Sequence, residues 1–405
     1  MTSDKIRIAF IKFGGLSAGG TEKFLQTIAA HLPKTMFDVT YFYCDTAPYI
    51  GSDFIHPDTS QERLKFMEEH NVKLVKFQVG AKDVTTPTHD WIDTNFWELF
   101  NESDFDIIQT GRAGHPEYPF VKIKKTPIID SVHFLGGVDN QPNILRVMHI
   151  CEWAKEKWIN EGGDERRTVI ISHPMDIPDL NLDNVREELD LKDKIIFGFH
   201  QRGDDGIVSH IPLKAYKQIE DENTHFLILG GSQLYSEQAK KLELKNFQQL
   251  DHTADRRKIY SFLNSLDVYA HGRKDGEVNS TAMAEAMYFG LPIISHTSEV
   301  NNGHVECIRD AGHVVDTVEE YSAQLNKLKS DQIYKETLSQ NALKNFKENY
   351  ELQGQLAKII DVYQDVARNP APFIDYKLIL KSKLQDAKHA LKKKLKSIPL
   401  KPNAS

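Results

Sequence analysis

Two glutamates, Glu277 and Glu285, lie eight positions apart in the stretch GRKDGEVNSTAMAEAMYFGLPIIS, residues 272–295. Glu277 ends a polar loop. Glu285 lies in a segment of helical character that Asn279 or Ser280 can cap at its N-terminus. An ionised carboxylate accepts hydrogen bonds from two hydroxyl groups at once, so both positions suit contacts with a polyol.

The start of this predicted helix suits an anion. The free N–H groups of its first turn, from about Ser280 to Ala282, can hold a diphosphate, helped by the helix dipole. Thr281 and Glu285 share one face of the helix because they are four residues apart. A nucleotide sugar has the matching layout, with diols on both sides of a diphosphate. The alternative is that Glu277 and Glu285 are ordinary surface residues.

Short apolar runs alternate with helical patterns along most of the chain. In the first half, strands are expected at 6–13, 37–44, 72–77, 105–110, 126–134, 146–151 and 167–172. In the second half, they are expected at 194–200, 224–231, 246–250, 267–272, 291–295 and 311–315. Helices are expected at 21–32, at 280–289 and in a long tract at about 335–367. This alternation predicts parallel sheets that are covered on both faces.

A charged and polar stretch near 178–192 predicts a linker between two halves. The predicted fold class is α/β, with two Rossmann-like doubly wound domains facing a cleft at the carboxyl ends of their strands. The predicted boundaries are an N-terminal domain at 1–185, a C-terminal domain at 186–350, a closing helix at 351–372 and a tail at 373–405.

The first expected strand ends in a glycine-rich loop, GGLSAGG, residues 14–20. Gly14, Gly15 and Gly20 are candidate phosphate contacts because the loop leads into a helix N-terminus. A tight turn without a ligand is the alternative. The loop lacks the Gly-x-Gly-x-x-Gly spacing of nicotinamide-binding proteins, which disfavours a dehydrogenase.

The stretch around the two glutamates resembles the E-x7-E signature of retaining glycosyltransferases with the GT-B fold, specifically the family 4 group. Glu277 and Glu285-Ala-Met are followed by Gly290-Leu-Pro and an apolar strand, as in that family. The segment GGTEKFLQTIAAHL, residues 19–32, resembles the family's Gly-Gly-x-Glu helix start. Similar segments are also found at 128–134 and 169–176, so the resemblance extends from residue 6 to about 365.

The resemblance implies transfer of a sugar from a nucleotide-diphosphate donor to a glycan or lipid-linked acceptor, with retained configuration and without a metal or other cofactor. It implies that Glu277 contacts the transferred sugar and Glu285 the ribose. His133 would lie across the cleft near the sugar, although a structural role is an equal alternative. Further donor contacts are expected from Val278, Asn279, Ser280 and Thr281.

The same family binds the diphosphate with an arginine and with a lysine five or six residues later. In FHQRGDDGIVSH, residues 199–210, Arg202 fits the arginine, but Ile207 and Val208 stand at the lysine positions. Candidates for the missing charge are Arg273, Lys274 and His210, and weak donor binding without a replacement is the alternative. We favour the first two. Asp204-Asp205-Gly206 is typical of a turn rather than of a metal site.

Composition narrows the classes of protein. The chain has 405 residues, of which 40% are hydrophobic, and it contains no apolar run long enough to span a membrane. Its N-terminus lacks a signal-peptide pattern, and its three cysteines lack paired spacing, which together predict a cytoplasmic location. A net charge of −8 argues against nucleic-acid binding as the main function.

The C-terminal segment has the opposite charge. Residues 376–401 contain nine lysines and one acidic residue, Asp386. A helix there would carry an apolar stripe of Leu380, Leu384, Ala387, Leu391 and Leu395. A basic amphipathic helix suits an anionic membrane surface, and a solvated helix packed on the acidic body is an equal alternative.

Other functions also fit a nucleotide-sugar site. The alternatives within the fold are a nucleotide-sugar epimerase and a phosphorylase, although we find no candidate lysine for the pyridoxal cofactor of the latter. A non-catalytic nucleotide-sugar-binding protein is the alternative from another class.

Overall fold

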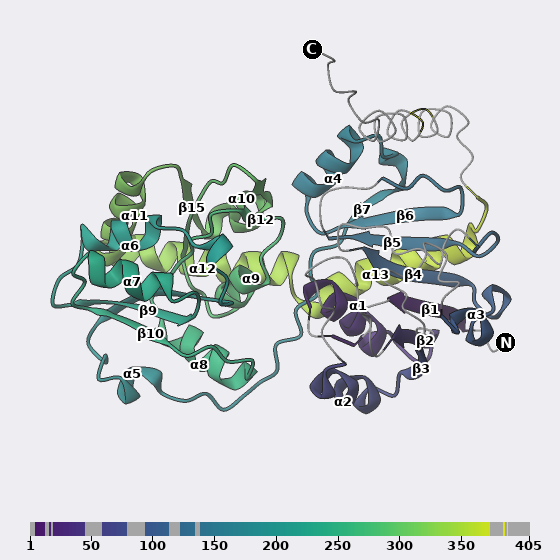
Figure 1. The fold of residues 1–405 in the computed structure, drawn as a ribbon, viewed down its shortest axis with the longest axis horizontal. Helices are drawn as coiled ribbons and strands as arrows, with labels where there is room; N and C mark the ends of the chain where they lie inside the picture. The colour runs from purple at the N-terminus through teal and green to yellow at the C-terminus, as the bar shows by residue number, and fades with distance from the viewer. Residues whose placement is uncertain are drawn as a thin grey trace, which may run out of the picture. The chain divides into compact units, whose positions relative to one another are not determined.

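The computed structural model describes residues 5–12, 16–17, 19–44, 59–78, 94–112, 122–133 and 138–372, together with Leu384 and Ala387. The chain divides into two compact units (Figure 1). The first is drawn from 1–149, 155–170 and 360–405, and the second from 150–154 and 171–359. The first unit is therefore discontinuous in sequence.

The first unit contains a parallel seven-stranded sheet with the order β3-β2-β1-β4-β5-β6-β7. Its strands are β1 (Ile6–Lys12), β2 (Phe37–Cys44), β3 (Lys73–Phe77), β4 (Ile107–Arg112), β5 (Ile128–Val132), β6 (Ile144–His149) and β7 (Thr168–Ile170). Its helical segments include α1 (Gly20–His31), α2 (Gln61–Glu69), α3 (Phe96–Leu99), η1 (Glu102–Asp104) and η2 (Glu165–Arg167). Helix α4 (Glu152–Asn160) begins in the second unit and continues into the first.

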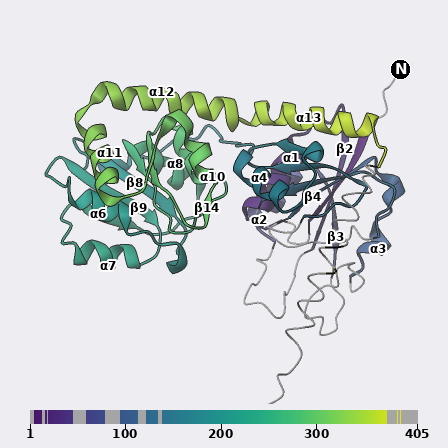
Figure 2. The same cartoon turned by 90° about the horizontal axis from the view of Figure 1, so that it is seen from above.

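Helix α13 (Leu352–Arg368) returns the chain to the first unit. Tyr363 is buried against the rings of Phe10 on β1 and Phe37 on β2. Its hydroxyl donates to the Gln109 Oε1 atom on β4 at 3.0 Å. Helix α13 thus packs on the seven-stranded sheet, beside which it runs in Figure 2.

The second unit contains a parallel six-stranded sheet with the order β10-β9-β8-β11-β13-β15. The strands are β8 (Ile195–Gln201), β9 (Thr224–Gly230), β10 (Phe247–Leu250), β11 (Val268–Ala270), β13 (Ile293–His296) and β15 (Gly312–Val315). A separate two-stranded sheet pairs β12 (Gly276–Glu277) with β14 (Asn301–Asn302). In both large sheets the strand order reverses beside the first strand, as in a Rossmann-like domain.

The helices of the second unit form two packed groups. One group contains α6 (Ile211–Lys217), α7 (Leu234–Lys241) and α11 (Val318–Ser330). The other contains α5 (Val185–Glu188), α8 (Arg256–Ser265), α9 (Thr281–Tyr288) and α12 (Gln332–Asn349). The remaining helical segments are η3 (Asp205–Ile207), α10 (Gly303–Ile308) and η4 (Arg309–Ala311). A continuous apolar core lies between these helices and the sheet, so the strands are buried on both faces.

The α/β fold class is confirmed, and each predicted strand is present with its ends moved by a few residues. The stretch predicted as a linker, 178–192, lies inside the second unit, which begins at residue 171. Leu180 and Leu182 pack against the core of that unit, and the Asp183 N–H donates to Ser261 Oγ at 2.8 Å. The predicted domain boundary at residue 185 therefore falls within a packed segment.

The predicted tract at 335–367 is two helices, α12 and α13, rather than one. Tyr350 interrupts it because its side chain is buried and its carbonyl oxygen accepts a hydrogen bond from the Met175 N–H at 2.8 Å. Apart from Leu384 and Ala387, the predicted basic tail lies outside the described residues. Over the part of the chain that the structure describes, no helix is long and apolar enough to cross a membrane.

Candidate active site

A pocket of about 260 Å³ opens at the carboxyl edge of the six-stranded sheet. Its walls come from the ends of β8, β9, β10 and β11 and from the start of α9. The lining residues are His200, Gln201, Arg202, Leu229, His252, Thr253, Ile259, His271, Arg273, Glu277, Thr281 and Ala282. The pocket lies where ligands bind in doubly wound sheets, and it contains four of the residues predicted from sequence.

The backbone of Glu277 is fixed by the small β12–β14 sheet, in which Glu277 is the partner of Asn302. Gly276 precedes it with a φ of +61°, a left-handed conformation that favours glycine. A Cβ atom at Gly276 would lie 1.8 Å from the Asn301 carbonyl oxygen. Only glycine therefore allows β12 to approach β14 closely enough to hold Glu277 in place.

We expect Gly276→Ala to lower the free energy of unfolding of the second unit by about 2–4 kcal/mol, because it adds both backbone strain and a clash. Urea unfolding measures this loss. Gly354→Ala is the matched control, since a Cβ atom there meets nothing within 4 Å and the site is helical. Equal unfolding midpoints for the two variants would contradict the assignment.

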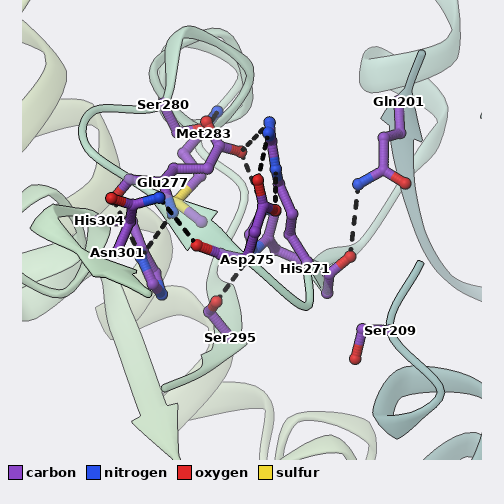
Figure 3. Close-up of polar contacts among 12 residues, drawn as sticks. Gln201, Ser209, His271, Asp275, Glu277, Ser280, Met283, Ser295, Asn301 and His304 are labelled. Atoms are coloured by element: carbon purple, nitrogen blue, oxygen red, sulfur yellow. Dashed lines mark hydrogen bonds and ion pairs between the residues drawn. The ribbon is translucent and has the colours of Figure 1, made fainter. Parts of the chain in front are cut away.

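The Glu277 carboxylate is largely buried, with 15% of its side chain exposed. Its Oε1 atom lies 3.1 Å from His271 Nε2 and 4.0 Å from Arg273 Nη1. Burial raises the pKa of Glu277, but the hydrogen bond from His271 and the charge of Arg273 outweigh it, so the pKa lies below the ordinary glutamate value. Glu277 is thus an anion at neutral pH. Figure 3 shows Glu277 and His271 among the polar contacts of the site.

Helix α9 begins at Thr281, and Ser280 is its N-cap, with the Ser280 Oγ atom accepting from the Met283 N–H at 3.2 Å. This decides between the two predicted caps, Asn279 and Ser280. Thr281 and Ala282 in the first turn line the pocket. Glu285 lies behind that turn, where its Oε2 atom is 3.0 Å from Nε2 of the pocket residue His200.

Two arginines line the pocket, and they differ in exposure. The Arg202 side chain is 65% exposed and pairs with Asp204 at 2.9 Å. The Arg273 side chain is 21% exposed, and Asp275 holds it through two contacts, of 2.6 Å to Nε and 2.9 Å to Nη2. Lys274 is exposed and is not among the residues that line the pocket.

The segment with the missing lysine pairs with the loop that carries Arg273. Val208 forms an antiparallel bridge with Arg273, and the Lys274 N–H donates to the Ile207 carbonyl oxygen at 3.0 Å. The predicted turn before it is confirmed, because Asp204 Oδ1 accepts from the Gly206 N–H at 2.9 Å. Arg273 therefore lies next in space to the positions where the family places its lysine.

Several other predicted residues lie away from the pocket lining. Val278 is buried, and its carbonyl oxygen accepts from the Cys151 thiol at 3.1 Å. The Asn279 side chain donates to the Ile150 carbonyl oxygen at 2.9 Å. His210 contacts the Gln238 side chain at 3.0 Å.

The remaining candidates belong to the first unit. His133 follows β5, is buried, and packs edge-on against Phe24 with ring centroids 4.8 Å apart. Gly20 is the first residue of α1. Gly14 and Gly15 lie outside the described residues.

The histidines of the site were not predicted from the sequence. His200 and His271 come at the carboxyl ends of β8 and β11, and His304 lies on α10, where its Nδ1 atom is 3.3 Å from the Glu277 nitrogen. A histidine at the carboxyl end of a parallel strand can indicate a site residue when the strand lies where the strand order reverses, because ligands bind there in doubly wound sheets. His304 offers no such signal, since it approaches Glu277 only through the β12–β14 pairing.

Burial lowers the pKa of four histidines around the site: His173, His271, His296 and His304. The pKa of His173 falls to about 4. In the unfolded chain these histidines take up protons near pH 6.5, whereas in the folded unit they take them up only at lower pH. The free energy of unfolding therefore falls as the pH drops from 6.5 towards 4.

We expect urea unfolding to show a lower free energy at pH 5.5 than at pH 7.5, by up to about 1.4 kcal/mol per pH unit for each histidine. His173→Gln should reduce this difference in unfolding free energy, because the unfolded chain then has one histidine fewer that takes up a proton. The control is His252→Gln, which changes an exposed histidine. An unchanged pH dependence in His173→Gln would contradict the prediction.

The second unit is similar in sequence to a known protein family. Residues 181–345 match the family described as Glycosyl transferases group 1. This part of the chain is therefore similar to the group 1 glycosyltransferases. The matched residues include Glu277 and Glu285, as well as the other residues that line the pocket.

Several solved structures share the fold of this chain. HepE of Anabaena, solved with UDP and glucose, has a TM-score of 0.67 and 15% identity over 89% of this chain and 100% of that one. A glycosyltransferase of Rickettsia africae has a TM-score of 0.69 and 14% identity over 91% and 100%. Sucrose-phosphate synthase of Thermosynechococcus elongatus has a TM-score of 0.65 and 15% identity, over 89% of this chain and 99% of that one. No curated protein matches the sequence. The GT-B fold is confirmed.

Proposed function

We propose that the protein transfers a sugar from a nucleoside-diphosphate donor to a glycan or lipid-linked acceptor and retains the anomeric configuration. The observation that carries the proposal is the convergence of an anionic Glu277, two arginines and a helix N-terminus on one pocket. These groups match the hydroxyls of a sugar and the charge of a diphosphate. HepE, which shares the fold, was solved with UDP and glucose.

In this proposal the donor lies across the start of α9. The diphosphate contacts Arg202, Arg273 and the first-turn N–H groups, including that of Thr281. Arg273 supplies the charge that the family lysine gives elsewhere, because it lines the pocket and its backbone pairs with Val208. Glu277 contacts the transferred sugar. Glu285 contacts the ribose, next to its partner His200.

The proposed reaction breaks the bond between the anomeric carbon and the phosphate oxygen and forms a bond to the acceptor oxygen on the same face. The acceptor proton passes to the departing phosphate oxygen. The arginines and the helix N–H groups stabilise the charge that develops on the leaving diphosphate. Because these groups balance the charge, we expect transfer to continue in the presence of EDTA.

A panel of UDP-, GDP- and other activated sugars tests the donor assignment. A donor that binds the folded protein raises its melting temperature. The donor with the largest shift is then incubated, radiolabelled in the sugar, with candidate glycan and lipid-linked acceptors. Label that moves to an acceptor with the donor's anomeric configuration, as determined by NMR, is the expected result.

The same incubation separates the other candidate functions. A nucleotide-sugar epimerase would convert the label into a different sugar nucleotide without any acceptor. A non-catalytic binding protein would retain the donor unchanged. Either outcome would overturn sugar transfer while leaving the donor site in place, and a panel without any thermal shift would overturn the donor site as well.

A further inference from the structure

We propose that His271 is a positioning residue: its imidazole, anchored by Ser295, holds the Glu277 carboxylate in the orientation that receives the transferred sugar. This inference rests on the proposed function and deepens it. Three groups form a continuous chain, from Ser295 Oγ to His271 Nδ1 at 2.8 Å and from His271 Nε2 to Glu277 Oε1 at 3.1 Å.

The sheet fixes the histidine end of this chain. Strand β11 pairs with β13 in the register Ala270↔Ile294, and the His271 N–H donates to the Ile294 carbonyl oxygen at 2.8 Å. The buried Tyr321 hydroxyl lies 2.9 Å from the His271 carbonyl oxygen and 3.1 Å from that of Ile294. His271 is itself only 3% exposed. Its ring therefore has a rigid base from which to orient the carboxylate.

The backbone of Glu277 is held from the other side by a second histidine. His304 Nε2 donates to the His296 carbonyl oxygen at 3.0 Å, which leaves Nδ1 to accept the Glu277 N–H at 3.3 Å. His304 is fully buried. Two imidazoles thus fix Glu277, one at the main chain and one at the side chain.

The chain Ser295–His271–Glu277 contains the residue types of a hydrolytic triad, but its geometry excludes that role. Ser295 is fully buried on β13, so its hydroxyl cannot reach a substrate. Glu277, in contrast, lines the pocket. The Glu277 carboxylate is therefore the group of this series that can contact a ligand, and Ser295 fixes the His271 ring.

The charge state of His271 suits positioning. Burial lowers its pKa, although the hydrogen bond to Glu277 raises it in part, so the ring is neutral at neutral pH. A neutral ring donates one hydrogen bond through Nε2 and accepts the Ser295 hydroxyl at Nδ1. Glu277 consequently keeps its negative charge and its remaining acceptor positions for a sugar.

Two substitutions of His271 separate orientation from simple packing. In His271→Gln, the longer side chain places its amide nitrogen near the former Nε2 atom and can still donate to Glu277. In His271→Asn, the shorter amide can reach Ser295 but not the carboxylate. We expect His271→Gln to keep both kcat and the donor KM within about threefold of wild type. We expect His271→Asn to lose about ten- to thirtyfold in kcat and to raise the donor KM at least about threefold.

A double-mutant cycle tests whether the effect passes through Glu277. His271→Asn combined with Glu277→Ala should be no slower than Glu277→Ala alone, since the residue that His271 orients is then absent. Equal losses of kcat in the asparagine and glutamine variants would overturn the proposal. Wild-type kcat in His271→Asn, or additive losses in the cycle, would overturn it as well.

Calorimetry gives a readout that needs no transfer. The sugar nucleotide with the largest thermal shift is compared with its parent nucleoside diphosphate, and the affinity gained from the sugar reports its contact with Glu277. This gain should shrink at least threefold in His271→Asn and remain in His271→Gln. An unchanged gain in both variants overturns the positioning role alone, whereas no binding by the wild type overturns the proposed function with it.

Discussion

Glu277→Ala should reduce sugar transfer about a thousandfold while the second unit melts near the wild-type temperature. Glu277 is an anion in the pocket, and losing one preorganised group that contacts the reacting centre costs about a hundred- to a thousandfold in kcat. The fold should survive, because β12 is held through backbone contacts and truncation leaves space that opens to the pocket. Transfer of radiolabelled sugar measures the loss, and a melting curve reports the fold.

Two further variants sharpen this test. Glu277→Gln keeps the shape of the side chain but removes its charge, so it distinguishes electrostatic stabilisation from hydrogen bonding. Glu299→Ala removes an exposed glutamate from a nearby loop and should transfer at the wild-type rate. Wild-type turnover in Glu277→Ala would show that the assignment of this residue is wrong.

Arg202→Ala combined with Arg273→Ala should weaken donor binding about a thousandfold. Each charge-assisted contact with phosphate contributes about 1.5–3 kcal/mol, so each single variant should lose about ten- to a hundredfold in affinity. Calorimetric titration with the donor measures these losses. A melting curve for each variant confirms that it is folded.

Lys274→Ala is the matched control for Arg273→Ala, since the two cations are adjacent in sequence but only Arg273 lines the pocket. We expect its donor affinity to change less than twofold. Unchanged affinity after removal of both Arg273 and Lys274 would rule out this loop as the source of the missing charge. A larger loss in Lys274→Ala than in Arg273→Ala would assign the contact to the lysine.

Most of the fold could be predicted from sequence because both faces of each large sheet are covered. Buried parallel strands appear as nearly continuous apolar runs, such as Ile6–Lys12, and these runs are distinct from the helical patterns between them. The β12–β14 pair could not be predicted, since each strand has two residues and no apolar pattern. The predicted linker was misplaced because its polar residues conceal Leu180 and Leu182, which pack against the core.

The candidate site was predicted in part, because only some of its features are local in sequence. The spacing of Glu277 and Glu285 and the position of Arg202 are local in sequence, so a single chain reveals them. The choice between Arg273 and Lys274 depends on the pairing of Val208 with Arg273, which joins segments far apart in the chain. His271 was missed because a lone histidine at a strand end has the same sequence pattern whether it supports the core or the site.

The return of α13 to the first unit has a consequence for synthesis on the ribosome. Phe10 and Phe37 are translated early, but Tyr363, which packs on both, follows the whole of the second unit. Since translation adds about 5–20 residues per second, these two rings lack their partner for many seconds. The nascent chain must therefore protect an apolar strand surface throughout that interval, and the unit that starts first is completed last.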